Sequence, residues 1–300
     1  MKNKIIGTFI MFFCVFSCLF LNSQLKKTYT QKEENYIKWV EFNIPMEIMK
    51  KAMQLDINSR NEENEVDFIE ILSYIAAENY GSFKGIKASD VEKTLQKIKA
   101  SSEKPKMFSY YEQAYSAIMS EYLGDYEKDG KTMYGLKVKH PLNGYYTHCD
   151  DFGASRNYGF KRKHLGHDLM TSIGTPVCAV EDGVIEAIGW NRYGGWRIGV
   201  RSFDSKRYYY YAHLRKDNPY IKGLQEGKTV KAGEIIGYAG RTGYSIKENV
   251  NNIDTPHLHF GIQLIFDESQ KDGNNQIWIN CYEITKLLKN PPLSIEVKGM

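Results

Sequence analysis

Histidines are concentrated in three short motifs of this 300-residue chain. All seven lie between His140 and His259, and five of them fall in His164-Leu165-Gly166-His167-Asp168, Tyr211-Ala212-His213-Leu214 and Pro256-His257-Leu258-His259-Phe260. Side chains alternate along a β-strand, so a His-x-His segment in a strand places two imidazoles on one face. Catalytic zinc sites take three protein ligands from His, Asp, Glu or Cys and leave a fourth position open. The motifs therefore predict a metal site made by His164, Asp168 and one histidine of the pair.

The first motif contains two candidate ligands four residues apart. On a straight strand this separation is roughly 13 Å, too far for two ligands of one ion with bonds of about 2 Å. The chain is therefore expected to bend between His164 and Asp168, and Gly166 is the residue expected to permit it. In the His-x-His pair, both residues can bind metal, or one can bind while its neighbour acts on substrate. Sequence spacing does not separate these alternatives.

His213 follows a tyrosine-rich segment that is predicted to be a strand over residues 207–213. Strand alternation places Tyr209 and Tyr211 on the same face as His213 unless a bulge intervenes. His213 is then either a buried residue that closes an aromatic strand or a participant in the metal site.

The N-terminus combines a basic start with an apolar-leaning run over residues 5–21. These 17 residues reach the lower limit for crossing a bilayer, roughly 17–25 residues, and exceed the usual signal-peptide core of about 7–15. No small-x-small cleavage site follows, so residues 1–27 are predicted to anchor the chain in the cell membrane. The alternatives are a cleaved secretion signal and a lipoprotein signal at Cys18, which fits poorly because the run continues to Leu21. Each alternative places the rest of the chain outside the cytoplasmic membrane.

Charge and cysteine content narrow the function classes. A net charge of +4 without a polybasic block gives no support for nucleic-acid binding. Of the five cysteines, Cys14 and Cys18 lie in the apolar run, and Cys149, Cys178 and Cys281 remain without close spacing. This odd set argues against a disulfide scaffold and against a Cys-type zinc knuckle. Cys178 is expected to be a small buried apolar residue.

The remaining chain divides into two regions by pattern. Residues 28–130 are predicted to form a small all-α domain, and residues 131–300 a mainly antiparallel β domain. The expected helices begin near Pro45, cover 68–76 with a stop at Gly81, cover 89–100 with Ser89 as N-cap, and cover 108–123. The expected strands cover 177–179, 184–190, 196–203, 207–213, 235–238 and 257–266, and a tail helix is expected over 282–288.

The segment from about 145 to 265, some 40% of the chain, resembles the lysostaphin/LytM-type zinc endopeptidases of bacterial cell-wall peptide. The matching residues are His164-x-Gly166-x-Asp168, Gly174-Thr175-Pro176-Val177, Ala179-x3-Gly183-Val184, Tyr211-Ala212-His213-Leu214, Val230-x-Ala232-Gly233, Ile236-Gly237, Gly240-x-Thr242-Gly243 and His257-Leu258-His259-Phe260. The resemblance implies the fold of that family for residues 131–300.

Carried over residue by residue, the resemblance makes His164, Asp168 and His259 the ligands of one zinc ion per chain. It makes His213 and His257 the catalytic pair that handles the water and the reacting carbonyl. His167 occupies a variable position of the motif and is expected to take no part in the site, although it is the first rival ligand to check. The implied activity is a zinc-dependent endopeptidase that cuts peptidoglycan cross-links or stem peptides during cell-wall remodelling.

Substrate contacts are expected from Tyr193, Tyr209 and Tyr211, with packing across the sheet as the alternative for each. The segment Tyr244–Thr255 is an insertion relative to the simplest family members, and it is expected to border the groove and shape substrate choice.

Two alternatives to this assignment follow from the sequence. The first is a non-catalytic scaffold or activator of the cell envelope with the same fold, although no ligand has been lost here. The second concerns the helical domain, where the segment ending at Glu78 resembles the helix that carries the acid glutamate of lysozyme-like lytic enzymes. The simpler expectation is a spacer, or a site for an envelope protein partner, between the membrane and the peptidase.

Overall fold

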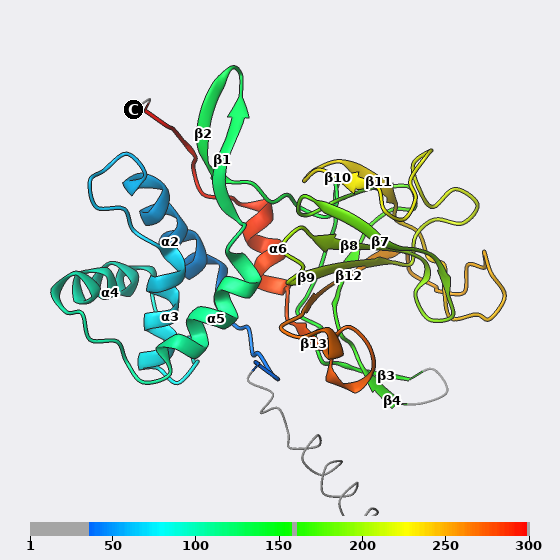
Figure 1. The fold of residues 1–300 in the computed structure, drawn as a ribbon. Coiled ribbons are helices and arrows are strands. Elements are labelled where there is room, and N and C mark those ends of the chain that lie inside the picture. The colour runs from blue at the N-terminus through cyan, green and yellow to red at the C-terminus, as the bar shows by residue number, and fades with distance from the viewer. Residues whose placement is uncertain (1–35, 158–160, 299–300) are drawn as a thin grey trace, which may run out of the picture. The chain divides into compact units, whose positions relative to one another are not determined.

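The computed structural model describes residues 36–157 and 161–298 (Figure 1). From Lys38 onward the chain forms one compact unit. The expected membrane segment, residues 5–21, lies outside the described residues together with Cys14 and Cys18. Within the described part of the chain, no helix has both the length and the apolar character needed to cross a bilayer.

The first part of the described chain is helical, as predicted. The helices are α2 (Met46–Ser59), α3 (Phe68–Glu78), α4 (Ala88–Ala100) and α5 (Phe108–Met119). Helix α3 begins where the Asp67 carboxylate accepts a hydrogen bond from the Ile69 N–H at 2.7 Å. It ends before Tyr80 and Gly81, which both take positive φ values of 51° and 82°.

The predicted N-cap of α4 is wrong by two residues. The helix begins at Ala88, and Lys87 is its N-cap. The reason is Asp90, whose carboxylate accepts a hydrogen bond from the Lys87 N–H at 3.0 Å and satisfies a donor at the helix start. Ser89 therefore lies inside the first turn.

A three-stranded sheet follows α5 and was not predicted. Strands β1 (Leu123–Lys128) and β2 (Lys131–Leu136) form a hairpin, and β14 (Ile295–Glu296) pairs with β2. The connecting residues Asp129 and Gly130 both have positive φ, 53° and 74°. An Asp-Gly pair with these angles is the preferred turn of a two-residue hairpin, so the signal was present in the sequence.

The main sheet is antiparallel and has seven strands in the described residues. Figure 1 labels β7, β8, β9 and β12 among them. The strand order is β10-β7-β8-β9-β12-β13, with β5 also paired to β12. The bounds are β5 (His167–Met170), β7 (Gly183–Asn191), β8 (Gly195–Ser202), β9 (Arg207–Ala212), β10 (Thr229–Val230), β12 (His257–Leu264) and β13 (Ile277–Ile279). Smaller pairs are β3 (Ser155–Asn157) with β4 (Lys161–Lys163), and β6 (Pro176–Cys178) with β11 (Ile235–Tyr238). The predicted antiparallel β region is confirmed, and each predicted strand has a counterpart.

Strand β12 shows the alternation that positions the site. Leu258, Phe260, Ile262 and Leu264 are all 0% exposed and form the core face of the strand. The residues between them, which begin with His257 and His259, therefore lie on the opposite face.

The tail after β12 packs back onto the rest of the unit. It contains the short 3₁₀ turns Glu268–Gln270 and Gly273–Asn275, strand β13, and helix α6 (Tyr282–Lys289), which confirms the predicted tail helix. Helix α6 packs against α2, and the Met46 N–H at the start of α2 donates to Glu283 Oε2 at 2.8 Å.

A buried ion pair joins the sheet to the helical region. The Arg207 side chain on β9 is fully buried and donates to both carboxylate oxygens of Glu181, at 2.8 and 3.0 Å. Its Nη2 also contacts Asp204 at 3.0 Å, and its Nη1 donates to the Ala117 carbonyl of α5 at 2.7 Å. A buried guanidinium needs such partners, so the contact ties α5 to the sheet.

Candidate active site and metal centre

Three side chains meet where β12 runs between β9 and β5. His259 on β12 lies opposite Asp168 on β5 and opposite Ala212 on β9. His164 precedes β5, and its Nε2 lies 3.1 Å from Asp168 Oδ1 and 2.8 Å from His259 Nδ1. His259 Nδ1 lies 3.1 Å from the same Asp168 oxygen. One ligand atom from each of the three residues falls within 4.8 Å of the others.

Gly166 is required here by close contact. It was expected to permit a bend through its backbone freedom, but its φ is not positive. A Cβ at this position would lie 2.6 Å from His259 Cε1 and 2.8 Å from the Phe260 carbonyl oxygen. Glycine is therefore needed because the chain before β5 passes directly against β12.

The donor set fits a zinc ion. Two imidazole nitrogens and one carboxylate oxygen are ligands that zinc takes in catalytic sites. His164 and Asp168 are buried and His259 is partly buried, so the three ligand atoms lie close together and are largely shielded from solvent. His164 Nδ1 lies 3.1 Å from Asp151 Oδ2, so its Nδ1 can hold the proton and its Nε2 can offer a lone pair.

Asp151 and Arg156 surround the ligands and were not found by sequence analysis. Asp151 Oδ1 lies 3.1 Å from His167 Nδ1, while Oδ2 faces His164. Arg156 Nη2 on β3 donates to Asp151 Oδ2 and to Asp168 Oδ2, each at 2.8 Å. These residues come from the segment before the first histidine motif, and no regular spacing links them to it.

The electrostatics of this group follow from burial and hydrogen bonding. Burial raises the pKa of Asp168, but hydrogen bonds from His164 and His259 outweigh it and hold the pKa well below its usual value. The same balance, with His164 and His167 as donors, lowers the pKa of Asp151. Burial opposes the charge on His164, yet the two carboxylates raise the pKa of that imidazole to about 9. A metal ion therefore competes with a proton for His164.

His213 and His257 form a second pair beside this group. Their ring centroids are 4.9 Å apart, and His257 Nε2 lies 3.7 Å from Asp168 Oδ1. His213 Nδ1 lies 2.9 Å from the Thr242 carbonyl oxygen, and His257 Nδ1 lies 2.8 Å from that of Thr255. A carbonyl only accepts, so each Nδ1 carries a proton and each Nε2 is left as the basic nitrogen. Burial, with His257 and His259 nearby, lowers the pKa of His213 well below its usual value.

His213 reaches this position through its backbone. Strand β9 ends at Ala212, and His213 takes a φ of 60°, which non-glycine residues rarely adopt. Its N–H donates to the Gly194 carbonyl at 2.7 Å, which holds the turn. The alternation of β9 is broken at this residue, so His213 does not share a face with Tyr209 and Tyr211.

The expected substrate contacts of Tyr209 and Tyr211 are therefore corrected. Both side chains are 0% exposed. The Tyr209 hydroxyl donates to Glu181 at 2.6 Å, and the Tyr211 hydroxyl accepts from the Val180 N–H at 2.9 Å. Tyr210, on the other face of β9, lies with its ring 5.9 Å from that of His259.

Tyr193 and the insertion Tyr244–Thr255 lie at the site. The Tyr193 and Tyr244 rings both contact the Arg162 guanidinium, and the Tyr244 ring is 5.8 Å from that of His213. The insertion also supplies the Thr255 carbonyl that holds His257. Trp190 and Trp196 donate from their indole N–H groups to Ser245 and Asn249 of the insertion, at 3.2 and 2.9 Å. The two tryptophans thus support the insertion.

His167 lies outside the ligand group. It is fully buried, its Nδ1 faces Asp151, and its Nε2 lies 2.7 Å from His148 Nδ1. Its ring also packs edge-on against that of Tyr282 in α6, at 5.3 Å. Both nitrogens are therefore engaged away from the ligand atoms of the other motifs.

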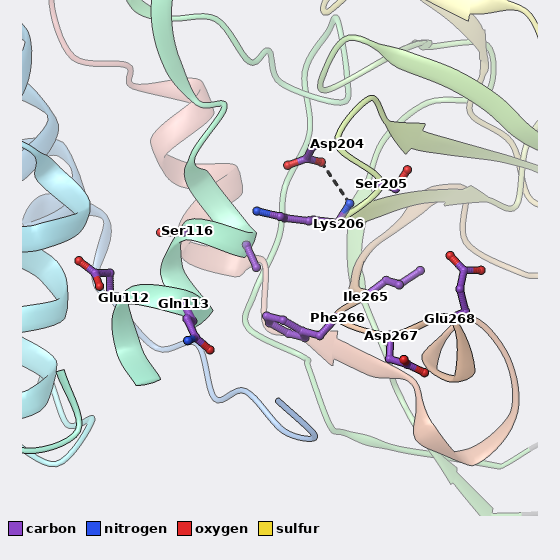
Figure 2. Close-up of a pocket in the computed structure, with 11 residues that line it drawn as sticks. Glu112, Gln113, Ser116, Asp204, Ser205, Lys206, Ile265, Phe266, Asp267 and Glu268 are labelled. Carbon is purple, nitrogen blue, oxygen red and sulfur yellow. Dashed lines mark hydrogen bonds between the residues drawn. The ribbon is translucent and has the colours of Figure 1, made fainter. Parts of the chain in front are cut away.

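Two other features of the described chain do not join this site. Glu78 is exposed and pairs with Lys97 Nζ at 2.9 Å, so it lacks the apolar surroundings of a catalytic acid. A cavity of about 720 Å³ lies between α5, the turn at residues 204–206 and the segment after β12 (Figure 2). Its lining is mixed in charge, with Glu112, Asp204 and Lys206 among the labelled side chains, and it contains no histidine.

Comparison with known proteins identifies the part of the chain that carries the site. Residues 162–274 match Peptidase family M23, a family of zinc metallopeptidases, and form a domain homologous to lysostaphin/LytM-type peptidoglycan endopeptidases. An L-Ala–D-Glu endopeptidase from Bacillus subtilis is 38% identical over 122 residues, which cover 41% of this chain and 36% of the relative. Glycyl-glycine endopeptidase ALE-1 from Staphylococcus capitis is 43% identical over 98 residues, which cover 32% of this chain and 24% of the relative.

The chain thus spans about a third or less of the length of these curated relatives. Among solved structures, a candidate glycyl-glycine endopeptidase, LytM, from Ruminococcus gnavus is similar with a TM-score of 0.53 and 25% identity. The match covers 82% of this chain and 92% of that chain.

Proposed function

We propose that this chain, through its M23 domain, is a zinc-dependent endopeptidase that hydrolyses peptide bonds in peptidoglycan cross-links or stem peptides. The observation that carries the proposal is the meeting of His164, Asp168 and His259 beside two imidazoles with fixed Nδ1 atoms. The names of the relatives, an L-Ala–D-Glu endopeptidase and a glycyl-glycine endopeptidase, support the substrate class.

His164, Asp168 and His259 would hold one zinc ion per chain. Such an ion, when bound, acidifies water and polarises a peptide carbonyl. The protein prepares the donors beforehand: Asp151 sets the tautomer of His164, and Arg156 neutralises part of the charge on the two carboxylates.

His213 and His257 would move the protons of the reaction. Each presents a free Nε2, so each can accept a proton from the attacking water. Once protonated, the same nitrogens can return the proton to the leaving amine and donate hydrogen bonds to the oxygen on which negative charge develops. The lowered pKa of His213 keeps its imidazole neutral at neutral pH, so a proton does not already occupy its Nε2.

In this proposal residues 131–300 are the peptidase region, and residues 28–130 are a spacer or a site for an envelope protein partner. The protein works outside the cytoplasmic membrane, held there by residues 5–21 or released after cleavage of that segment. Fractionation of cells that express the full chain separates these two alternatives, because an anchored protein stays with the membranes.

The full-length protein, purified with zinc, is incubated with purified cell walls, and new amino groups and new reducing sugar ends are measured. An endopeptidase releases amino groups, and a chelator stops the release. Reducing ends without new amines would show glycan cleavage and defeat the proposal. The competing function, a non-catalytic scaffold, predicts neither product and has no requirement for zinc, so metal analysis of the same preparation separates it.

A further inference from the structure

Arg162 lies at the edge of the site and is not used by the proposed mechanism. It is on β4, two residues before His164. Its guanidinium lies 5.6 Å from the ring centroid of Tyr193 and 5.3 Å from that of Tyr244, and its Nη2 donates to the Tyr244 hydroxyl. Because the Tyr244 ring is 5.8 Å from the His213 ring, one aromatic side chain separates this positive charge from the base.

The charge of Arg162 has no carboxylate partner in the described residues. Its Nε is buried and makes no hydrogen bond there. Arg156, Arg201 and Arg207 do have such partners, in Asp151, Glu186 and Glu181. The partly buried Arg197, Arg215 and Arg241 have none in the described residues, but they do not contact the rings of Tyr193 and Tyr244 beside His213. The buried Nε cannot reach an outside acceptor, but the side chain is only partly buried and its Nη1 makes no hydrogen bond in the described residues, so this terminal nitrogen can bind an acceptor from outside the protein.

We infer, on the basis of the proposed function, that Arg162 binds a carboxylate of the substrate and so selects acidic stem peptides over uncharged glycine bridges. A guanidinium presents parallel N–H donors that match the two oxygens of a carboxylate. Stem peptides of peptidoglycan carry carboxylates on glutamate residues, whereas a glycine bridge is neutral between its ends. The stacking on Tyr193 and Tyr244 fixes the plane of the guanidinium. The Arg162 side chain therefore loses little conformational entropy when it binds a carboxylate.

Three synthetic peptides test this inference on the full-length zinc-loaded protein. The first contains an L-alanyl-D-glutamate unit with its free carboxylate, the second is identical except for a carboxamide in that place, and the third is pentaglycine. Hydrogen bonds to a charged group predict that wild-type kcat/KM favours the carboxylate over the carboxamide by about 10- to 100-fold. Pentaglycine should be the poorest of the three.

Arg162→Gln removes the charge and should bring the carboxylate and carboxamide peptides to within about threefold of each other. The loss should fall on the carboxylate peptide. Arg162→Lys keeps the charge without the planar fork and should retain part of the preference. Arg192→Gln is the matched control, because Arg192 also lies 5.6 Å from the Tyr193 ring centroid but is exposed to solvent. That variant should keep the wild-type preference.

Several results overturn the inference while leaving the endopeptidase intact. The first is equal cleavage of the carboxylate and carboxamide peptides by the wild type, and the second is a preference for pentaglycine. The third is an equal loss of kcat/KM on the carboxylate and carboxamide peptides in Arg162→Gln. The last would mean that Arg162 only supports Tyr244. If the wild type cuts none of the three peptides and releases no amines from cell walls, the proposed function fails, and the inference fails with it.

Discussion

Replacing Asp151 with asparagine tests how the metal ligands are held. Each oxygen of this carboxylate faces two donors. Oδ2 lies 3.1 Å from His164 Nδ1 and 2.8 Å from Arg156 Nη2, while Oδ1 lies 3.1 Å from His167 Nδ1 and 3.4 Å from the Asp168 backbone nitrogen. Asparagine has nearly the same size but exchanges one acceptor for an NH₂ donor. In either orientation the amide NH₂ group then faces two N–H groups, and one histidine loses its side-chain acceptor.

The consequence for the metal follows from the tautomer of His164. Without the ionised carboxylate, the proton on His164 Nδ1 keeps only the neutral Asp151 backbone carbonyl, 3.1 Å away, as an acceptor, so it is held there less strongly and Nε2 offers its lone pair less often. Loss of such an outer partner lowers metal affinity by about 10- to 100-fold. This range corresponds to about 1.4–2.7 kcal/mol of binding free energy. We therefore expect Asp151→Asn to bind zinc 10 to 100 times more weakly, by this reasoning.

Competition for zinc with a chromophoric chelator measures the dissociation constant. Asp150→Asn is the control, because the neighbouring carboxylate is exposed and, in the described residues, accepts only from Asn280 Nδ2, at 3.0 and 3.1 Å, and from the Phe152 N–H at 3.4 Å. The control should bind zinc as the wild type does. If Asp151→Asn keeps its native circular dichroism and binds zinc within about twofold of the wild type, Asp151 does not act as an outer partner of the metal ligands.

Three further variants test a close contact at the site, the buried ion pair that joins the sheet to α5, and a buried carboxylate of α2. Gly166→Ala places a Cβ 2.6 Å from His259 Cε1 and 2.8 Å from a backbone oxygen, so zinc content should fall sharply, and full zinc occupancy in metal analysis would contradict the contact. Arg207→Met leaves Glu181 buried without its ion-pair partner, which should lower the free energy of unfolding in urea by about 3–5 kcal/mol. A loss of less than about 1 kcal/mol would show that the ion pair is dispensable. Burial raises the pKa of Asp56 to about 6, above its unfolded value, so its contribution to stability is present at low pH and is lost as pH rises through 6. Between pH 4 and pH 7, the free energy of unfolding of Asp56→Asn should therefore rise by about 2–3 kcal/mol relative to that of the wild type. If the difference in unfolding free energy between the two proteins does not change with pH, Asp56 does not titrate in this range.

The face of β12 that carries His257 and His259 could be predicted from sequence because it depends only on local alternation. Apolar residues at every second position, beginning at Leu258, fix which side of the strand is buried. The helices were predictable for the same reason, since spacing and caps act within a few residues. The N-cap of α4 was misplaced because two residues each have an acidic side chain three positions later: Ser89 has Glu92, and Lys87 has Asp90. In the structure Asp90 accepts from the Lys87 N–H, so the helix begins after Lys87.

The parts that sequence analysis missed depend on contacts between distant segments. Asp151 and Arg156 act on His164 through side chains whose positions are set by the fold of the segment before β5, and no spacing announces them. The break in alternation at His213 arises from one backbone angle, held by a hydrogen bond to Gly194. Without that angle, alternation wrongly groups Tyr209 with the site.

Zinc content and cleavage of cell walls, measured in the same set of histidine variants, separate the metal ligands from the catalytic pair. His259→Ala removes a ligand and should leave little zinc and no activity. His213→Ala and His257→Ala should keep close to one zinc per chain while activity falls by about 100- to 10,000-fold, the usual loss for one acid–base group. His167→Ala should keep both zinc and activity. Loss of zinc in His257→Ala with zinc and activity retained in His259→Ala would reverse the two roles, and an empty site in His167→Ala would show that the metal binds a different set of residues.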